Sequence, residues 1–360
     1  MKKFFGLLGR NKHRLATCAL AFGFLVDIVT FRNLNLNYAL ILLGAHLFIV
    51  AFSILVLSIP LKSDVDSFVA RVRSWIPVAQ QYSMGNLLSA FLILYSASGS
   101  LAASWPFFVL VAVAAVGNET LKLQKYRLPF QTSLFCLNLV LFSALLWPVL
   151  FRSISTATFL VSVLVAFFVF ALFRRTLWLV ARAAFSASKK NINRGAFSVL
   201  VVVVLLYFTN IIPPIPLTLS TIDFYYSVAR SGDSYIARDE MRSFVDRFLS
   251  FTPRTLVLSS GAPAYVFTAI SAPAKLDTTI VHRWQYFNEN THSWVTKNSV
   301  EFPIVGGRQG GYRAFSLSES PAAGRWRVSV ETTSGKILGR SYMTVEHSTT
   351  QPETHRVEIR

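Results

Sequence analysis

The hydrophobic pattern of the chain changes near residue 216. Before this point, long apolar runs are separated by short basic segments, and beyond it polar and apolar residues alternate. Alternation with a period of two is typical of β-strands, whereas long apolar runs indicate buried or membrane-spanning helices. The run Pro213-Pro214-Ile215-Pro216 marks the boundary, because prolines end a helix and stiffen the chain that leaves it. We therefore predict a polytopic helical part over 1–216 and a β-rich part after it.

The apolar runs of the first part predict about seven transmembrane helices. A bilayer crossing needs about 20 mostly apolar residues. The candidate runs cover 14–31, 38–60, 82–99, 101–117, 129–151, 157–179 and 196–213. The third and fourth runs meet with almost no loop between them. Together they are too long for one crossing and barely long enough for two.

Basic residues favour seven crossings and give the orientation, because Lys and Arg gather in cytoplasmic loops. With seven spans, the loops on one side contain only Arg32 and Arg152, and the other side carries the remaining basic clusters. Merging the third and fourth spans would place basic loops on both sides. We predict a multi-pass membrane protein with a cytoplasmic N-terminus and an extracytoplasmic C-terminal domain.

Composition excludes several classes of protein. Hydrophobic residues make up 53% of the chain and charged residues 14%, against about 25% charged in an average soluble domain. This excludes a disordered chain, a coiled coil and an ordinary soluble enzyme. The net charge of +18 is compatible with nucleic-acid binding, but the excess lies beside predicted spans, where anionic lipid explains it. We expect the lipid bilayer, and not nucleic acid, as a partner.

The β-rich part divides into three segments. Residues 217–252 read as a juxtamembrane linker with an amphipathic helix over Ile236–Phe251, where apolar residues recur at helical spacing. Residues 253–346 contain seven or eight short alternating runs separated by turn residues, which predicts an all-β, immunoglobulin-like sandwich. Residues 347–360 are polar and read as a disordered tail.

The alternation also predicts which side chains face the core of this sandwich. His282 and Trp284 share one face of a strand, with Arg283 on the other. Trp326 alternates with valines, so we predict that Trp284 and Trp326 fill the core and that His282 packs beside Trp284. Trp294 follows a polar turn and is the candidate for an exposed tryptophan.

Several short elements of the β-rich part occur in a familiar order. They are His-Arg-Trp at 282–284, Trp-Val at 294–295, Gly-Gly-Arg at 306–308, Gly-Gly-Tyr-Arg at 310–313, Gly-Arg-Trp-Arg-Val at 324–328 and Gly-Arg at 339–340. Over about 250–346, this order resembles the bacterial domain of unknown function 2914. The first part is also similar to that of multi-pass members, including Gly23-Phe24-Leu25-Val26-Asp27 in the first run. The resemblance implies an envelope location and a β domain, and it implies no activity.

Polar residues inside the predicted spans are candidates for chemistry, because ionisable groups are costly in a bilayer. Asp27 and His46 lie in the first two spans, and Asn86 and Asn138 lie in later ones. If the first two helices are antiparallel neighbours, Asp27 and His46 form a proton relay or an ion site. The alternative is a structural hydrogen bond between helices.

In the outer domain, arginines and one tryptophan are the candidate binding residues. The set comprises Arg283, Arg308, Arg313, Arg325, Arg327 and Trp294. Guanidinium groups suit an anionic glycan, a lipid headgroup or an envelope protein, and the alternative is a solvated strand face. The glycines at 306–311 precede a strand and not a helix, so they do not form a phosphate loop. Histidine spacing predicts no metal site, and we predict no cofactor and no catalytic residues.

The sequence thus favours a non-enzymatic binding or interaction module of the envelope. The alternative is a transporter or membrane enzyme with its site in the helical bundle around Asp27 and His46. A sensor would need a cytoplasmic output domain, which the sequence does not indicate. The ligand and the oligomeric state do not follow from these patterns.

Overall fold

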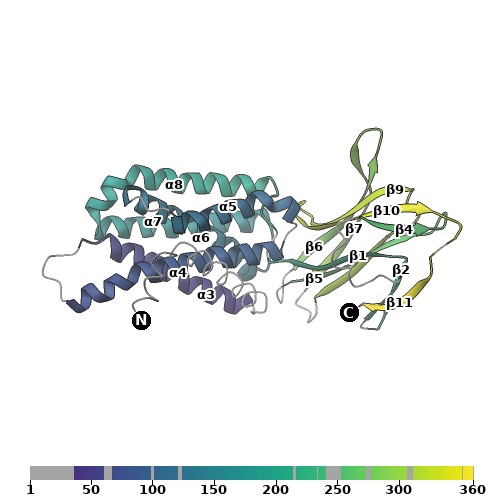
Figure 1. Cartoon of the computed structure of the whole chain (residues 1–360), viewed down its shortest axis with the longest axis horizontal. Helices are drawn as coiled ribbons and strands as arrows, with labels where there is room; N and C mark the ends of the chain where they lie inside the picture. Colours follow the sequence, from purple (N-terminus) through teal and green to yellow (C-terminus); the bar gives the residue numbers. More distant parts are fainter. Residues whose placement is uncertain are drawn as a thin grey trace, which may run out of the picture. The chain divides into compact units, whose positions relative to one another are not determined.

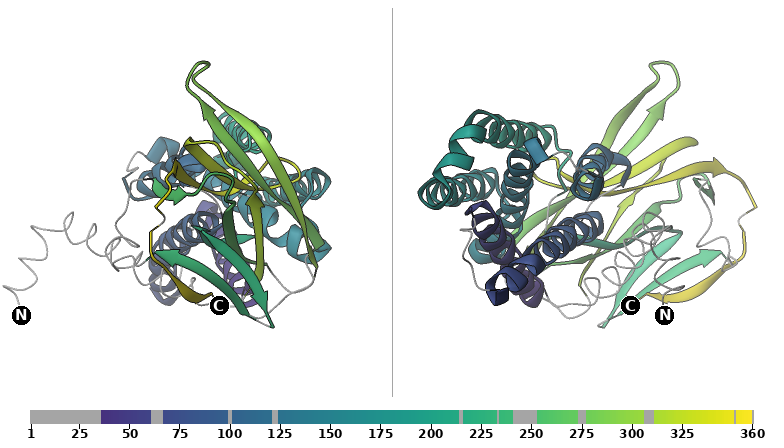
Figure 2. Two further views of the ribbon diagram at one scale, coloured as in Figure 1. Left: turned by 90° about the vertical axis from the view of Figure 1, so that its right-hand side faces the viewer. Right: turned by 60° about the vertical axis from the view of Figure 1, so that its left-hand side comes forward.

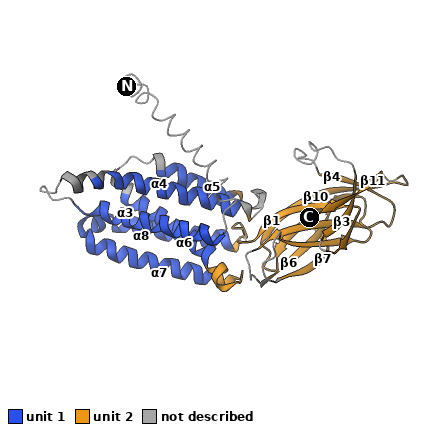
Figure 3. Cartoon of the chain, turned by 90° about the horizontal axis from the view of Figure 1, so that it is seen from below, with its two compact units in different colours: residues 1–96, 106–146, 159–207 blue, residues 97–105, 147–158, 208–360 orange. Residues whose placement is uncertain are grey.

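The computed structural model describes most of the chain after residue 35. The described residues are 36–60, 67–98, 101–120, 124–213, 216–232, 234–240, 253–272, 277–305, 311–350 and 352–359. They form two compact units, a helical one from residues 1–96, 106–146 and 159–207, and a β-rich one from residues 97–105, 147–158 and 208–360 (Figure 3). The predicted span 14–31, with Asp27, lies outside the described residues.

The described residues contain six helices (Figure 1). They are α3 (Leu36–Ser58), α4 (Ser67–Ala97), α5 (Leu101–Thr120), α6 (Gln124–Phe151), α7 (Thr156–Val180) and α8 (Arg182–Phe208). Four segments are long and apolar enough to cross a membrane: Leu36–Ser58, Leu128–Phe151, Thr156–Val180 and Arg182–Phe208. A shorter apolar helix covers Ser104–Asn118. The helical, membrane-type character of the first part is therefore confirmed, whereas seven spans are not.

Aromatic and small residues pack the helical unit. The Tyr95 hydroxyl on α4 donates to the Leu141 carbonyl on α6 at 3.0 Å, and the rings of Phe159 and Tyr207 stack between α7 and α8. At Gly195, an added Cβ would lie 1.9 Å from the Ser133 Oγ, so glycine allows α8 to approach α6 closely. Large apolar side chains such as those of Phe48, Phe52, Leu164, Phe168 and Leu179 remain exposed, as a lipid-facing surface requires.

Two basic segments that the sequence assigned to loops are helical. Helix α4 already includes Arg73, whose guanidinium donates to the carbonyls of Leu57 and Ile59 at the end of α3. Helix α8 begins at Arg182, and the Phe185 amide donates to the Ala181 carbonyl at 2.9 Å. Lys and Arg have good helix propensity, and a cation stabilises the carbonyl end of a neighbouring helix. Charge alone therefore did not indicate a loop.

The described residues of the β-rich unit form eleven strands in three sheets. A five-stranded sheet has the order β4 (Arg254–Leu258), β10 (Ile337–His347), β9 (Gly324–Thr332), β6 (Asp277–Asn288) and β7 (Ser293–Val305). A central sheet has the order β1 (Thr218–Tyr225), β5 (Ala264–Ser271) and β8 (Tyr312–Ser318). The third sheet has the order β11 (Thr354–Ile359), β3 (Ser234–Glu240) and β2 (Ser227–Ser231). Strands β10 and β4 pair in parallel, and the other strand pairs among the described residues are antiparallel. Figure 2 shows the long β6–β7 hairpin projecting from its sheet.

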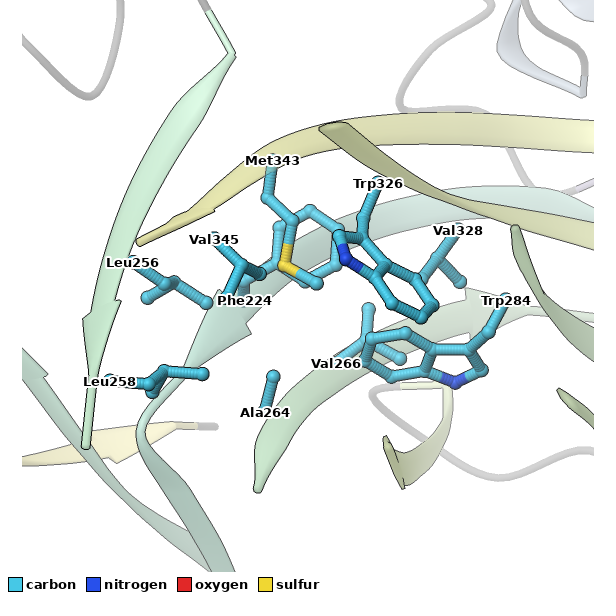
Figure 4. Close-up of a cluster of buried hydrophobic side chains, with 10 residues drawn as sticks. All are labelled: Phe224, Leu256, Leu258, Ala264, Val266, Trp284, Trp326, Val328, Met343 and Val345. Atoms are coloured by element: carbon cyan, nitrogen blue, oxygen red, sulfur yellow. The ribbon is translucent and has the colours of Figure 1, made fainter. Parts of the chain in front are cut away.

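The central sheet is buried on both faces, which confirms a β-sandwich and adds a layer to it. One face packs on the five-stranded sheet through Val266, Trp284, Trp326 and Met343, among others (Figure 4). The predicted core positions of Trp284 and Trp326 are thus correct. The other face packs on the third sheet through Phe267 and its neighbours.

Strands replace the linker and tail that the sequence predicted. Residues of the predicted linker 217–252 form β1, β2 and β3, and the start of the predicted amphipathic helix lies in β3; residues 241–252 lie outside the described residues. In the predicted tail 347–360, Val357 pairs with Ala237 and Ile359 joins the core. Pairing with distant strands overrode the weak local preference.

Candidate binding face of the five-stranded sheet

The face of the five-stranded sheet that points away from the core carries polar, aromatic and basic side chains. Side chains alternate between faces along a strand, so Arg327 lies opposite the core residues Trp326 and Val328. Across the strands, Arg327 is in register with Gln285 on β6 and Tyr342 on β10. Ser329 is likewise in register with Arg283 and Arg340. We call this surface the outer face.

Arginine and aromatic side chains alternate along one part of the outer face. The Arg327 guanidinium carbon lies 4.3 Å from the Trp294 ring centre, and that of Arg325 lies 4.0 Å from the Phe287 ring centre. The Phe287 and Trp294 rings meet edge to face with centres 5.1 Å apart, and Tyr342 lies 5.9 Å from Trp294. Cation–π contacts of this kind hold guanidinium groups in fixed orientations.

Two of the four arginines on the outer face have carboxylate partners. Arg325 makes a two-oxygen ion pair with Glu289, at 3.0 Å and 3.2 Å from its Nη2. Arg283 pairs with Glu331, whose carboxylate side chain is only 8% exposed. These two positive charges are therefore compensated locally.

The other two arginines, Arg327 and Arg340, have neutral partners. The Nε of Arg327 donates to Gln285 Oε1 at 2.8 Å, and the Nε of Arg340 donates to Ser329 Oγ at 3.1 Å. Burial lowers the pKa of Arg327 and the nearby charge of Arg340 lowers it further, whereas Tyr342 and the carboxylate of Glu331 raise it in part. The two guanidinium groups thus carry like charges that are compensated only in part, because Glu331 is already paired with Arg283.

The structure brings together four of the six predicted binding residues. Arg283, Arg325, Arg327 and Trp294 share the outer face. Arg313 does not, because it lies on β8 of the central sheet opposite Ala269, and Arg308 lies outside the described residues. Sequence reasoning missed Phe287, Tyr342, Gln285 and Arg340. Their alternation was readable, but their neighbours depend on cross-strand register.

His282 belongs to a buried network and not to the outer face. Its Nε2 lies 2.9 Å from Thr268 Oγ1, and its Nδ1 lies 3.0 Å from Ser316 Oγ. The Trp284 indole donates to the same Ser316 oxygen at 2.9 Å. Burial lowers the pKa of His282 to about 4, so the ring is neutral and has a structural position between two sheets.

The predicted polar residues of the helical unit lie around helix α4. His46 Nδ1 lies 3.1 Å from Ser83 Oγ, and Asn138 Nδ2 donates to Met84 Sδ at 3.1 Å. Asn86 lies on α4 itself. Gln80, one turn before Met84, is 3% exposed, and neither amide atom has a hydrogen-bond partner within the described residues.

In the part of the chain that the structure describes, no group of three or more His, Cys, Asp or Glu residues is arranged to hold a metal ion. The outer face carries guanidinium, carboxylate, amide and aromatic groups.

Comparison with known proteins identifies the domain but not its role. Residues 277–345 match the family described as "Protein of unknown function (DUF2914)", which confirms the resemblance found in the sequence. No curated protein matches the chain.

Two solved structures are similar at low identity. An immunoglobulin-like protein from Pseudomonas aeruginosa is 12% identical, with a TM-score of 0.21, covering 37% of this chain and 98% of the other. An alkylpurine DNA glycosylase from Pseudomonas fluorescens, bound to DNA containing an abasic-site analogue, is 10% identical. It has a TM-score of 0.24 and covers 76% of this chain and 67% of the other. At these TM-scores, neither likeness informs the function of this chain.

Proposed function

We propose that this protein is an integral protein of the bacterial cytoplasmic membrane that binds an acidic glycan of the envelope on the outer face of its extracytoplasmic β-sandwich. The helical unit anchors the domain. The proposal rests chiefly on one observation, the alternation of arginine and aromatic side chains among Arg325, Phe287, Trp294 and Arg327.

The membrane location is supported by the four long apolar helices and their exposed apolar side chains. The orientation is supported by the distribution of Lys and Arg, which gathers on one side of the predicted spans. A domain outside the cytoplasm meets the polymers of the envelope, so its ligand is sought there.

The chemistry of the outer face suits a sugar polymer that carries negative charge. Aromatic rings contact the apolar faces of sugar rings, and guanidinium groups bind oxyanions through paired hydrogen bonds. Tyr342 is 42% exposed and Trp294 is half-buried, so both rings have accessible surface beside Arg327.

Charge compensation argues against a bilayer surface as the ligand. Binding to anionic lipid depends on several uncompensated cations, each contributing about 1 kcal/mol. On the outer face, Glu289 and Glu331 compensate Arg325 and Arg283. The surface is therefore selective for a small number of anionic groups and does not form a general polyanion site.

The experiment measures binding by the full chain in lipid nanodiscs. The ligands are oligogalacturonate, which is acidic, its neutral methyl ester, and vesicles of phosphatidylglycerol. We expect oligogalacturonate to bind and Trp294→Ala to weaken it about tenfold, as for other aromatic contact residues. Val295→Ala is the matched control, because Val295 is exposed on the same strand but points to the opposite face.

Binding of the vesicles in preference to both saccharides would show that the ligand is lipid and not a glycan. An equal loss of binding affinity for Trp294→Ala and Val295→Ala would show that the outer face is not the binding site. Thermal unfolding of each variant separates a loss of binding from a loss of structure.

A second candidate function, transport or catalysis within the helical unit, is favoured by Gln80. A buried amide with no partner within the described residues is suited to a polar guest. Against this, His46 and Asn138 already contact Ser83 and Met84 of α4, as expected of side chains that hold helices together.

A further inference from the structure

We infer that Arg327 and Arg340 form an oxyanion subsite within the outer face, bordered by Trp294 and Tyr342, that takes a carboxylate group of the ligand. The inference rests on the proposed function and specifies where the negative charge of the glycan is recognised. Its ligand class is a uronic-acid type of sugar unit.

The two arginines come from adjacent strands and lie close together. In the β9–β10 ladder, Arg327 is in register with Tyr342, and Arg340 is in register with Ser329. Arg327 and Arg340 are thus diagonal neighbours on one face, a spacing that long side chains span easily. Two guanidinium groups at this spacing repel each other, and an anion between them removes the repulsion.

The hydrogen-bond partners of the two arginines leave most of their charge available. Each Nε is engaged by a neutral oxygen, from Gln285 for Arg327 and from Ser329 for Arg340. Arg327 is also hydrogen-bonded to Tyr342, and Glu331 offsets part of its charge. Neither forms an ion pair with a carboxylate within the described residues, whereas Arg283 and Arg325 each do. Because the Nε hydrogen bond and the Trp294 ring fix the guanidinium plane of Arg327, this group is oriented before any ligand arrives.

Fixed guanidinium groups discriminate by shape as well as by charge. A planar carboxylate accepts two parallel hydrogen bonds from one guanidinium, and a second arginine can contact the outer side of the same oxygens. Gln285 and Ser329 are hydrogen-bonding neighbours, and Tyr342 supplies a ring for the attached sugar. The geometry therefore points to a carboxylate on a ring, and the phosphate group is the alternative oxyanion to test.

The test compares charge removal inside and outside the outer face. The full chain in nanodiscs is titrated with oligogalacturonate, with its neutral methyl ester and with inorganic phosphate. The variant is Arg340→Gln, and the matched control is Arg238→Gln, which removes an exposed arginine from β3 of the third sheet. Losing a charge-assisted contact weakens binding about tenfold or more.

We expect Arg340→Gln to weaken oligogalacturonate binding about tenfold and Arg238→Gln to change it less than about threefold. Binding of the methyl ester should be insensitive to both substitutions. Arg327→Gln is a second variant and should resemble Arg340→Gln. Phosphate could instead bind more strongly than oligogalacturonate, with Arg340→Gln abolishing the binding of phosphate. That result would show that the subsite takes phosphate and that the proposed carboxylate ligand is wrong.

The arginine subsite and the glycan-binding function can be disproved separately. If the acidic and neutral saccharides bind equally well and Arg340→Gln has no effect, the subsite is wrong and the glycan-binding face remains. If neither saccharide binds but phosphate binds in an Arg340-dependent way, the two arginines bind an oxyanion, but the carboxylate ligand and the glycan proposal are both wrong. If none of the three binds, both are wrong.

Discussion

His282 on β6 and Ser316 on β8 are joined across the sandwich, with the histidine Nδ1 3.0 Å from the serine Oγ. The contact links the five-stranded sheet to the central sheet through a fully buried histidine. Thr268 and the ring of Phe302 complete its surroundings, and neither titrates near neutral pH. The histidine must therefore stay neutral for the sheets to remain in contact.

This arrangement predicts that acid destabilises the β-sandwich. Burial lowers the pKa of His282 from 6.5 to about 4 in the folded state, so between these values the unfolded chain binds a proton that the folded chain does not. The free energy of unfolding is highest above about pH 6.5 and falls by about 3 kcal/mol as the pH approaches 4. Near-ultraviolet circular dichroism during heating, at neutral pH and at about pH 5, measures the loss.

Two variants separate His282 from the other titrating groups. His282→Gln should be less stable at neutral pH, because buried partners lose their hydrogen bonds, and should show a smaller acid sensitivity. His292→Gln should keep the full acid sensitivity, because His292 is exposed. If the acid sensitivity of His282→Gln equals that of the original chain, another group is responsible.

A second prediction concerns the ion pair that attaches the third sheet. Arg254 on β4 contacts the buried carboxylate of Asp239 on β3 and lies 3.4 Å from Asp223 Oδ1 on β1. Replacing it by Met removes the cation that contacts this buried carboxylate, at a cost of about 3 kcal/mol or more. Arg238→Met removes an exposed arginine from the same strand as Asp239 and should change the stability by about 0.5 kcal/mol or less.

Thermal unfolding of the two variants in detergent measures the difference. Adding Asp239→Leu to Arg254→Met should recover part of the loss, since the buried carboxylate that lost this cation is then gone. Equal stability of Arg254→Met and Arg238→Met would show that the ion pair does not hold the sheets together.

The local sequence pattern was sufficient to predict which side chains enter the core of the β-sandwich, but not which side chains contact each other across strands. The inward positions of Trp284 and Trp326 followed from alternation, because the side-chain period is a property of the strand itself. The ion pair between Arg283 and Glu331 did not follow, because it joins residues on strands whose register is set by the whole sheet. The same reason explains why β11 was read as a tail: its pairing partner β3 lies more than a hundred residues away.

The start of helix α8 was predicted wrongly for a different reason. Basic residues at the start of α8 read as a cytoplasmic loop, but the positive-inside rule concerns the position of charge and not the backbone conformation. The Arg174 guanidinium donates to the Asn193 side chain at 2.8 Å, so the basic segments of α7 and α8 support each other as helices. The positive-inside rule therefore did not indicate whether these basic segments are loops or helices.

The unpartnered amide of Gln80 gives a third prediction, which separates anchoring from chemistry in the helical unit. If α4 only packs against its neighbours, Gln80→Met should leave the thermal stability unchanged or raise it, because an unpartnered buried amide is replaced by an apolar group of similar size. Ser83→Ala removes the partner of His46 and should lower the stability. A greater loss for Gln80→Met than for Ser83→Ala would indicate a bound polar guest and favour the second candidate function.

The fourth prediction concerns the side of the membrane on which the β-sandwich lies, since the ligand class depends on it. Lys and Arg concentrate in segments such as 182–194, which we expect in the cytoplasm, whereas the β-rich unit follows a further apolar run. An alkaline phosphatase fused after Arg360 should therefore be active, because this enzyme folds only where disulfides form. A green fluorescent protein of the type that matures only in the cytoplasm should be dark at the same position.

The same two reporters fused after Lys190 provide the control and should show the reverse pattern. Phosphatase activity after Lys190 but not after Arg360 would place the outer face in the cytoplasm. An envelope glycan could then no longer reach Arg327 and Arg340, whatever their affinity for it in nanodiscs.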